Sequence, residues 1–172
     1  MAIGDSALKE ILSEQNVGIG SNSGFSATGK KFVAIGHNAG KVNTGYSVFI
    51  GHSAGQSAVS QQVVGIGNGA LQNNTVNGSV AVGYTAGGLN TSGRGTYIGG
   101  LAGAANTTGT GCTFVGYEAG KTNTNSPGNT YIGERAGKSS TGLNNTFLGY
   151  SAGSTNVGNS SIMIGYFAGS NE

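Results

Sequence analysis

The chain contains no tryptophan, one cysteine and one proline, and charged residues make up only 8% of its 172 residues. Because Cys112 is the only cysteine, an intrachain disulfide is excluded. The eight Lys and Arg residues are scattered among six acidic residues, with only Lys30 and Lys31 adjacent, so a basic stripe is missing and nucleic-acid binding is not expected. No apolar run approaches the roughly 20 residues of a membrane-spanning helix, and membrane insertion is not expected either.

Glycine, by contrast, is abundant and periodic, with 35 residues spread along the chain. An eight-residue phrase, roughly apolar-x-Ile-Gly-x-x-Ala-Gly, recurs eleven times at a spacing of 15 to 17 residues. We call the glycine that follows the Ile, Val or Leu of each phrase the reference glycine. A period held over the whole length is typical of one small unit stacked many times, which favours a scaffold or a binding surface over an enzyme. The reference glycines are Gly4, Gly20, Gly36, Gly51, Gly67, Gly83, Gly99, Gly116, Gly133, Gly149 and Gly165.

We call the residues at the same position of successive repeats a column. The columns one and three positions before the reference glycine are predicted to form the core. The residue directly before it is Ile, Val or Leu in every repeat, and the residue three before it is Val in five repeats and Thr in four. Alternate residues of a strand share one face, so both columns are predicted to point into an apolar core. Three residues after the reference glycine stands Ala in ten repeats and Ser23 in one, which indicates close packing by a second strand.

Each repeat is therefore predicted to form a strand, a tight corner, a short second strand and a turn, as one coil of a parallel β-solenoid or β-roll. Eleven coils of about 16 residues, about 4.8 Å apart, give an all-β stack about 50 Å tall. We expect residues 1–172 to form this single domain. Residues 7–15 are good helix formers, with Leu8, Ile11 and Leu12 on one face, and a short helix is expected there as a cap on the first coil.

The residue two before the reference glycine points away from the predicted core, yet it is also apolar. In an isolated roll this column would form a large exposed patch. We therefore predict an obligate homo-oligomer with the large residues of the column in its interface; the alternative is a monomer with a flattened apolar face. The large residues, called the aromatic column below, are Phe49, Tyr97, Phe114, Tyr131, Phe147 and Met163.

The phrases Phe-Val-Ala-Ile-Gly at 32–36 and Ser-Val-Ala-Val-Gly at 79–83 resemble the head repeats of trimeric autotransporter adhesins. Residues 129–133 and 145–153 are similar to repeats of phage tail-fibre proteins. The resemblance covers essentially the whole chain, although the repeat is longer than in adhesin heads. It implies left-handed coils and a parallel homotrimer, because each chain of an adhesin head forms a left-handed parallel β-roll and three rolls associate.

Several motifs are similar to known binding sites. Residues 116–122 and 133–139 are similar to phosphate-binding loops, but three rather than four residues separate their glycines, and the repeat explains them. His37 and His52 directly follow reference glycines of adjacent repeats, and we interpret them as solvent-facing because no further ligand stands nearby in that column. No metal, cofactor or catalytic constellation is expected, so we predict that the chain is not an enzyme.

The position directly after the reference glycine, called the corner column below, carries tyrosine in later repeats. Aromatic rings on an accessible rung can stack on the sugar rings of a surface glycan, and they can equally stack on one another from coil to coil. The candidate ligand surface consists of Tyr84, Tyr117, Tyr150 and Tyr166.

The sequence thus predicts a non-catalytic structural fibre or adhesin-head segment that supports or provides attachment to a host or target surface. The resemblance implies an extracellular or virion-surface location, with export or anchoring segments outside this chain. The alternative is an adhesin module that binds a cell-surface glycan, a matrix or an envelope receptor through its lateral surface and turns.

Overall fold

The computed structural model describes residues 1–11, 14–91 and 94–170. These residues form eleven short strands and no helix, and each strand ends directly before a reference glycine. The strands are β1 (Ala2–Ile3), β2 (Val17–Ile19), β3 (Val33–Ile35), β4 (Val48–Ile50), β5 (Val64–Ile66), β6 (Val80–Val82), β7 (Gly95–Ile98), β8 (Cys112–Val115), β9 (Thr130–Ile132), β10 (Thr146–Leu148) and β11 (Ile162–Ile164).

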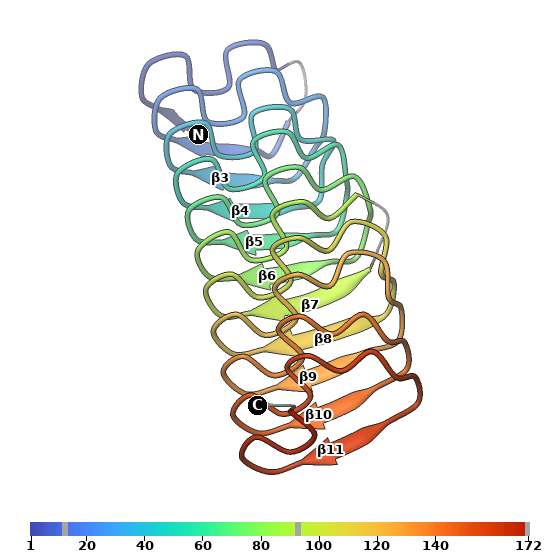
Figure 1. Ribbon diagram of the computed structural model, residues 1–172. Coiled ribbons are helices and arrows are strands. Elements are labelled where there is room, and N and C mark those ends of the chain that lie inside the picture. The colour runs from blue at the N-terminus through green and yellow to red at the C-terminus, as the bar shows by residue number, and fades with distance from the viewer. Residues whose placement is uncertain (12–13, 92–93, 171–172) are drawn as a thin grey trace.

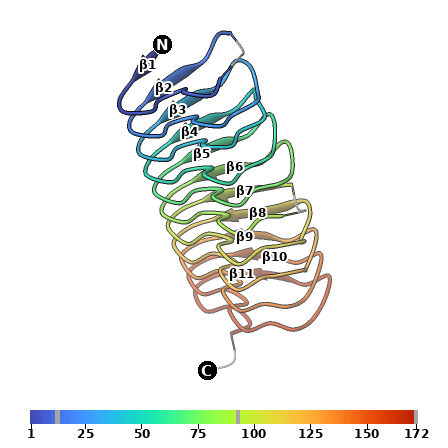
Figure 2. The same cartoon turned by 90° about the horizontal axis from the view of Figure 1, so that it is seen from above.

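All eleven strands belong to one parallel sheet in which neighbours in the sequence are also neighbours in space, from β1 to β11. The register keeps repeat positions aligned, since Val33 of β3 pairs with Val48 of β4 and Ile35 pairs with Ile50. The chain therefore rises by one strand per repeat, and the strands lie one above another along the stack (Figures 1 and 2). The predicted all-β parallel β-solenoid is confirmed.

Turns, rather than a second strand, complete each coil of the described chain. The amide of Ala39 donates to the carbonyl of Gly36 in its own coil, and the amide of Gly40 donates to the carbonyl of Ala54 in the next. Between Gly36 and Ala39, Asn38 adopts a left-handed conformation with φ 57°, which the extended backbone of a strand excludes. The predicted second strand is therefore wrong, whereas the predicted close packing at the Ala position is confirmed by the complete burial of that side chain in most coils.

The reference glycine allows neighbouring coils to approach closely. Gly133 adopts φ +133°, which side chains other than glycine rarely allow, and a Cβ at this position would overlap the carbonyl oxygen of Gly149 in the next coil. Both constraints apply together, so only glycine fits. This explains why the same position is glycine in every repeat.

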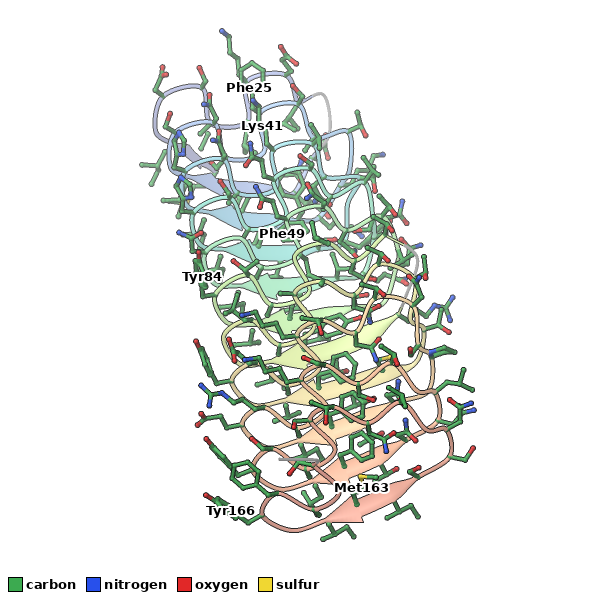
Figure 3. The ribbon with its side chains drawn as sticks, in the orientation of Figure 1. Phe25, Lys41, Phe49, Tyr84, Met163 and Tyr166 are labelled. Carbon is green, nitrogen blue, oxygen red and sulfur yellow. The ribbon has the colours of Figure 1, made fainter. Side chains whose placement is uncertain are left out.

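The core of the solenoid is the aromatic column, which the sequence analysis placed on the outside. Phe49, Tyr97, Phe114, Tyr131 and Phe147 have no exposed surface in a single chain, and Met163 packs partly buried against the same core. Figure 3 labels Phe49 and Met163 within the stack. The prediction that these six residues form an oligomer interface is therefore wrong, because they already pack within their own chain.

Their rings stack from coil to coil. Ring centroids of Phe114 and Tyr131 lie 4.9 Å apart and nearly parallel, those of Tyr131 and Phe147 lie 4.8 Å apart, and Tyr97 is tilted against Phe114 at 5.8 Å. The buried Tyr131 hydroxyl donates to Ser140 Oγ at 3.0 Å, so its polar end is satisfied. From β7 to β10 the interior is thus a run of four packed rings with internal partners for its hydroxyl groups. Gly65 and Ala81 separate Phe49 from this run.

The turn opposite the strand supplies the space for these rings. Gly137, with φ 56°, lies directly against the Tyr131 ring, which leaves no room for a Cβ. In the first coil Leu8 replaces this glycine, and it fills the space beside Gly18, where a Cβ would lie 2.7 Å from Leu8 Cγ. The large side chain that fills the core therefore comes from the strand in some coils and from the turn in others.

Buried asparagines hold the coils together beside the aromatic column. The side-chain oxygen of Asn129 accepts from the backbone amide of Asn145 at 2.8 Å, and that of Asn145 accepts from the amide of Ser161 at 2.8 Å. Their side-chain amides donate to backbone carbonyls, for example from Asn129 to Gly142 at 2.9 Å. Each such asparagine therefore satisfies backbone groups of neighbouring coils that turns leave unpaired.

The capping helix predicted over residues 7–15 does not form in its described residues; residues 12 and 13 lie outside them. Leu8 adopts φ 52°, which a right-handed helix excludes, and its amide donates to the carbonyl of Ser23 in the second coil. Leu8 and Ile11 nevertheless pack against the core. Backbone hydrogen bonds to the next coil form in place of helical ones, because an isolated helix of this length is only marginally stable in water.

Candidate functional surfaces

The outward side of the sheet carries the two columns that the sequence analysis assigned to the core. These residues, one and three positions before each reference glycine, are called the sheet face below. They are exposed or half-buried, with Ile98 at 41%, Ile132 at 40% and Leu148 at 43% exposure. Their predicted place in the core is wrong, because alternation along a strand turns them outward once the aromatic column fills the interior.

The sheet face contains only apolar residues and threonines, with no charged side chain. Eleven strands about 4.8 Å apart, each showing two side chains, make a surface roughly 50 Å by 12 Å, or on the order of 600 Å². This equals the largest apolar patch of a typical monomer. Its members are Met1, Val17, Val33, Val48, Val64, Val80, Thr96, Thr113, Thr130, Thr146 and Ile162 in one column, and Ile3, Ile19, Ile35, Ile50, Ile66, Val82, Ile98, Val115, Ile132, Leu148 and Ile164 in the other.

The tyrosines of the corner column border this face; three of them are exposed and Tyr150 is half-buried. Tyr84 is 60% exposed, Tyr117 49% and Tyr166 77%, and Figure 3 shows Tyr84 and Tyr166 at the outer edge of the same corner. Tyr150 and Tyr166 stack with ring centroids 5.3 Å apart. In the coil between those of Tyr84 and Tyr117, the corner-column position is Gly100. The four predicted residues therefore share a corner without forming one continuous aromatic surface.

The C-terminal end of this corner is the richest in aromatic and charged groups. Phe167 meets Tyr166 edge to face at 4.6 Å between ring centroids and is tilted against Tyr150 at 5.4 Å. Arg135 Nη1 donates to the Tyr150 hydroxyl at 3.4 Å. Two adjacent coils therefore present an aromatic cluster beside a guanidinium group.

The two histidines lie further toward the N-terminus in the same column. The exposed rings of His37 and His52 stack with centroids 5.2 Å apart at an interplanar angle of 20°. Across residues 1–11, 14–91 and 94–170, no three His, Cys, Asp or Glu side chains come together as a group that could hold a metal ion. The pair thus has the accessible position expected of it.

A buried carboxylate, Glu118, organises the main charge cluster. Lys121 Nζ lies 2.7 Å from Oε1, Lys138 Nζ lies 2.8 Å from Oε2, and Arg135 Nε lies 3.4 Å from Oε2. Hydrogen bonds from Lys121 and Lys138 lower the pKa of Glu118 to about 2, against its ordinary value of 4.5. The carboxylate is therefore held ionised and joins two adjacent coils instead of being free for acid–base chemistry.

Glu118→Gln is expected to remove part of the acid sensitivity of the fold. A carboxyl group whose pKa is depressed on folding contributes stability above its unfolded pKa, and this contribution is lost as pH falls from about 4.5 toward 2. We expect the native chain to lose about 1–2 kcal/mol more than the variant between pH 6 and pH 3, since both lysines are a third exposed. Denaturant unfolding at both pH values measures this difference, and Glu134→Gln, an exposed neighbour, is the control.

The remaining candidates for a chemical site are Cys112 and two glycine-containing segments, and each is part of the packing or of the turns of its coil. Burial raises the pKa of the Cys112 thiol, which lies 3.4 Å from the carbonyl oxygen of Ser126. The segments 116–122 and 133–139 form corners and turns of their coils, without the following helix that a phosphate-binding loop requires.

No described residue belongs to a helix that is long and apolar enough to cross a membrane. Comparison with family models, with curated proteins and with solved structures found no match to the chain.

Proposed function

We propose that the chain is a non-catalytic segment of an extracellular or virion fibre, assembled as a parallel homotrimer, that supports attachment to a host or target surface. The observation that carries the proposal is the unbroken stack from β1 to β11 around one internal column of side chains. A segment of this kind acts by its length and stiffness. Eleven coils extend about 50 Å.

Stiffness follows from the bonding between coils. Each strand pairs in register with the next, and turn amides such as Gly40 and Gly137 donate to carbonyls of the following coil. Bending the stack requires several of these bonds to lengthen at once. The ring stack and the asparagines add side-chain contacts in the same direction.

A non-catalytic role is supported by the settings of the chemically capable side chains. Glu118 is engaged by Lys121, Lys138 and Arg135, and Cys112 is buried with a raised pKa. His37 and His52 contact one another on the surface. In none of these settings does a nucleophile face a base across a cleft.

Association into a homotrimer is supported by the uncharged sheet face, which a single chain leaves open to water. Three copies rather than two, and the left-handed coil, rest on the resemblance to adhesin heads. We expect purified protein to have the mass of three chains by light scattering and to keep it on dilution. A mass of one chain at all concentrations would contradict the fibre proposal.

The second candidate function is glycan or matrix binding through the corner column. Exposure of Tyr84 and Tyr166, and the Tyr150–Tyr166 stack beside Arg135, favour it because sugar rings pack on accessible aromatic faces. If the corner binds glycans, Tyr84→Ala, Tyr117→Ala and Tyr150→Ala each weaken binding on a glycan array. The matched control is Tyr46→Ala, which removes a tyrosine that is 52% exposed and lies outside this column. A pure fibre shaft binds no glycan in any variant.

A further inference from the structure

We propose that a hollow on the turns leading into β5, β6 and β7 binds a single carboxylate-bearing sugar ring. This hollow, called the Gly78 hollow below, has a cavity volume of about 340 Å³ and is lined by Gln62, Asn77, Gly78 and Arg94. It lies before the strands, whereas the corner column follows them. The inference goes beyond the proposed function, because it adds a binding site that neither a fibre shaft nor the corner tyrosines require.

The Gly78 hollow arises where one coil lacks a side chain. Gln62, Gly78 and Arg94 occupy the same position, five before the reference glycine, in three successive coils. The outer two lie about 10 Å apart along the stack, and Gly78 places no side chain between them. A Cβ on Gly78 would meet no atom of the described chain within 4 Å, so this space is open. Its volume is at the lower end of the range for ligand pockets, roughly 300–1,000 Å³, and suits one ring-sized group.

The polar groups around the Gly78 hollow are mainly hydrogen-bond donors held by backbone contacts. The amide of Gln61 donates to Asn77 Oδ1 at 2.7 Å, so the Asn77 side chain has its two N–H groups left to offer. The amide of Gly78 donates to the carbonyl of Gln61 at 3.3 Å. The carbonyl of Arg94 accepts from the amide of Gly111 at 2.8 Å, and its guanidinium adds five N–H donors. A lining rich in donors favours a ligand rich in acceptors.

The charge around the Gly78 hollow favours a negative ligand. Residues 15–117 contain no aspartate or glutamate, and their charged side chains are Lys30, Lys31, Lys41 and Arg94. Within the described residues the carboxylates that pair with cations are Glu118 and Glu134, and neither pairs with Arg94. A ligand carboxylate therefore meets a guanidinium for which no side-chain carboxylate competes. Guanidinium groups bind carboxylates through two parallel hydrogen bonds.

The rest of the lining favours a sugar over an acidic peptide. The carboxylate of an Asp or Glu side chain is carried on an apolar stem, and none of the four lining residues is aliphatic or aromatic. A sugar ring carries hydroxyl groups, which accept from the Asn77 amide and both donate to and accept from the exposed Gln62 amide. With its carboxylate on Arg94, one such ring satisfies all three polar side chains.

Titration of the purified chain with glucuronate, glucose and acetate tests the ligand chemistry by ligand-observed nuclear magnetic resonance. Glucuronate has the ring and the carboxylate, whereas glucose has only the ring and acetate only the carboxylate. We expect glucuronate to bind at least about tenfold more tightly than either, because it alone meets both Arg94 and the amides. Equal binding of acetate would overturn the sugar as ligand, and equal binding of glucose would overturn the role of the carboxylate.

Arg94→Gln tests the charge. We expect at least about tenfold weaker binding of glucuronate, because the variant loses the charge-assisted hydrogen bonds to the carboxylate. Lys31→Gln is the matched control, since it removes one positive charge from an exposed residue of the same column, three coils from Gly78. An equal loss in both variants would mean that glucuronate responds to overall charge, and this would overturn the site.

Gly78→Asn tests the shape without a change of charge. Asparagine tolerates the left-handed φ of +77° better than most residues, and its side chain occupies the open space. We expect glucuronate binding to fall at least about tenfold. Gly111→Asn is the matched control, because Gly111 has φ +67° with equally open space but lies on the other side of Arg94, outside the lining. Circular dichroism verifies that both variants keep the sheet, and equal binding by the two would overturn the hollow as the site.

These outcomes are separate from those of the proposed function. All four lining residues belong to one chain, so the mass of the assembly bears on the homotrimer and not on the Gly78 hollow. Tyr84→Ala alters the corner column and is expected to leave glucuronate binding unchanged. Glucuronate binding that is lost in Tyr84→Ala and kept in Arg94→Gln would place the acidic sugar on the corner tyrosines and overturn the inference alone.

Discussion

Replacing Phe114 with alanine is expected to lower the free energy of unfolding by about 3–5 kcal/mol. Phe114 has no exposed surface, and its ring lies between those of Tyr97 and Tyr131. Truncation removes contacts with both neighbouring coils and leaves a cavity. The stack can close this cavity only in part, because coil spacing is set by backbone hydrogen bonds on every side.

Tyr117→Ala is the matched control, since Tyr117 lies three residues further on and is 49% exposed. Its loss is expected to cost less than about 1 kcal/mol, whereas Phe114→Leu keeps most of the buried volume and should cost no more than about 1.5 kcal/mol. Denaturant unfolding followed by circular dichroism measures all three variants at one protein concentration, because association changes apparent stability. A larger effect for Tyr117 than for Phe114 would place the aromatic column outside the core.

The period of the reference glycines was sufficient to predict the fold class. A strand must occur once per repeat if β-branched residues alternate directly before a glycine that recurs every 16 residues. The register of β3 against β4 and of every other pair follows from that period, since equal coils align equal positions. Turn length, not strand position, absorbs the 15- and 17-residue repeats.

The direction in which each column points could not be predicted from hydrophobicity, because both faces of the strand are apolar. The informative signal was packing volume. Gly137 faces Tyr131, and Leu8 faces Gly18, which shows that the middle residue of the strand and the turn residue fill one interior. Reading the columns pairwise for complementary size would have placed the aromatic column inside and left the sheet face as the functional candidate.

The second strand and the capping helix were wrong for a shared physical reason. Small residues and good helix formers indicate local preferences, but the turn amides of each coil bond to the next coil, as Gly40 does to Ala54 and Leu8 to Ser23. Left-handed residues are required for that arrangement, and the residue type marks them in only some coils: Asn38 favours this conformation, whereas Glu118 and Arg135 do not. The corner tyrosines were correctly placed on an accessible edge, because the residue directly after the reference glycine lies outside the strand pairing.

Gly133→Ala is expected to lower the free energy of unfolding by at least about 3 kcal/mol, since it combines backbone strain with a steric clash. Gly133 has φ +133°, and a methyl group there would overlap the carbonyl of Gly149. Two other glycines separate these causes. Gly78 has φ +77° with open space around its Cβ position, and Gly158 has neither a positive φ nor a contact closer than 3.6 Å.

We therefore expect a graded series in denaturant unfolding: Gly158→Ala close to neutral, Gly78→Ala about 1 kcal/mol and Gly133→Ala the largest loss. If Gly133→Ala cost no more than Gly78→Ala, the coils could separate locally to admit a methyl group, and turn conformation alone would explain the reference glycine. The larger cost that we expect at Gly133 would instead make coil spacing the constraint. The same spacing aligns the rungs of the sheet face, so the glycine column would be a requirement of the surface as well as of the fold.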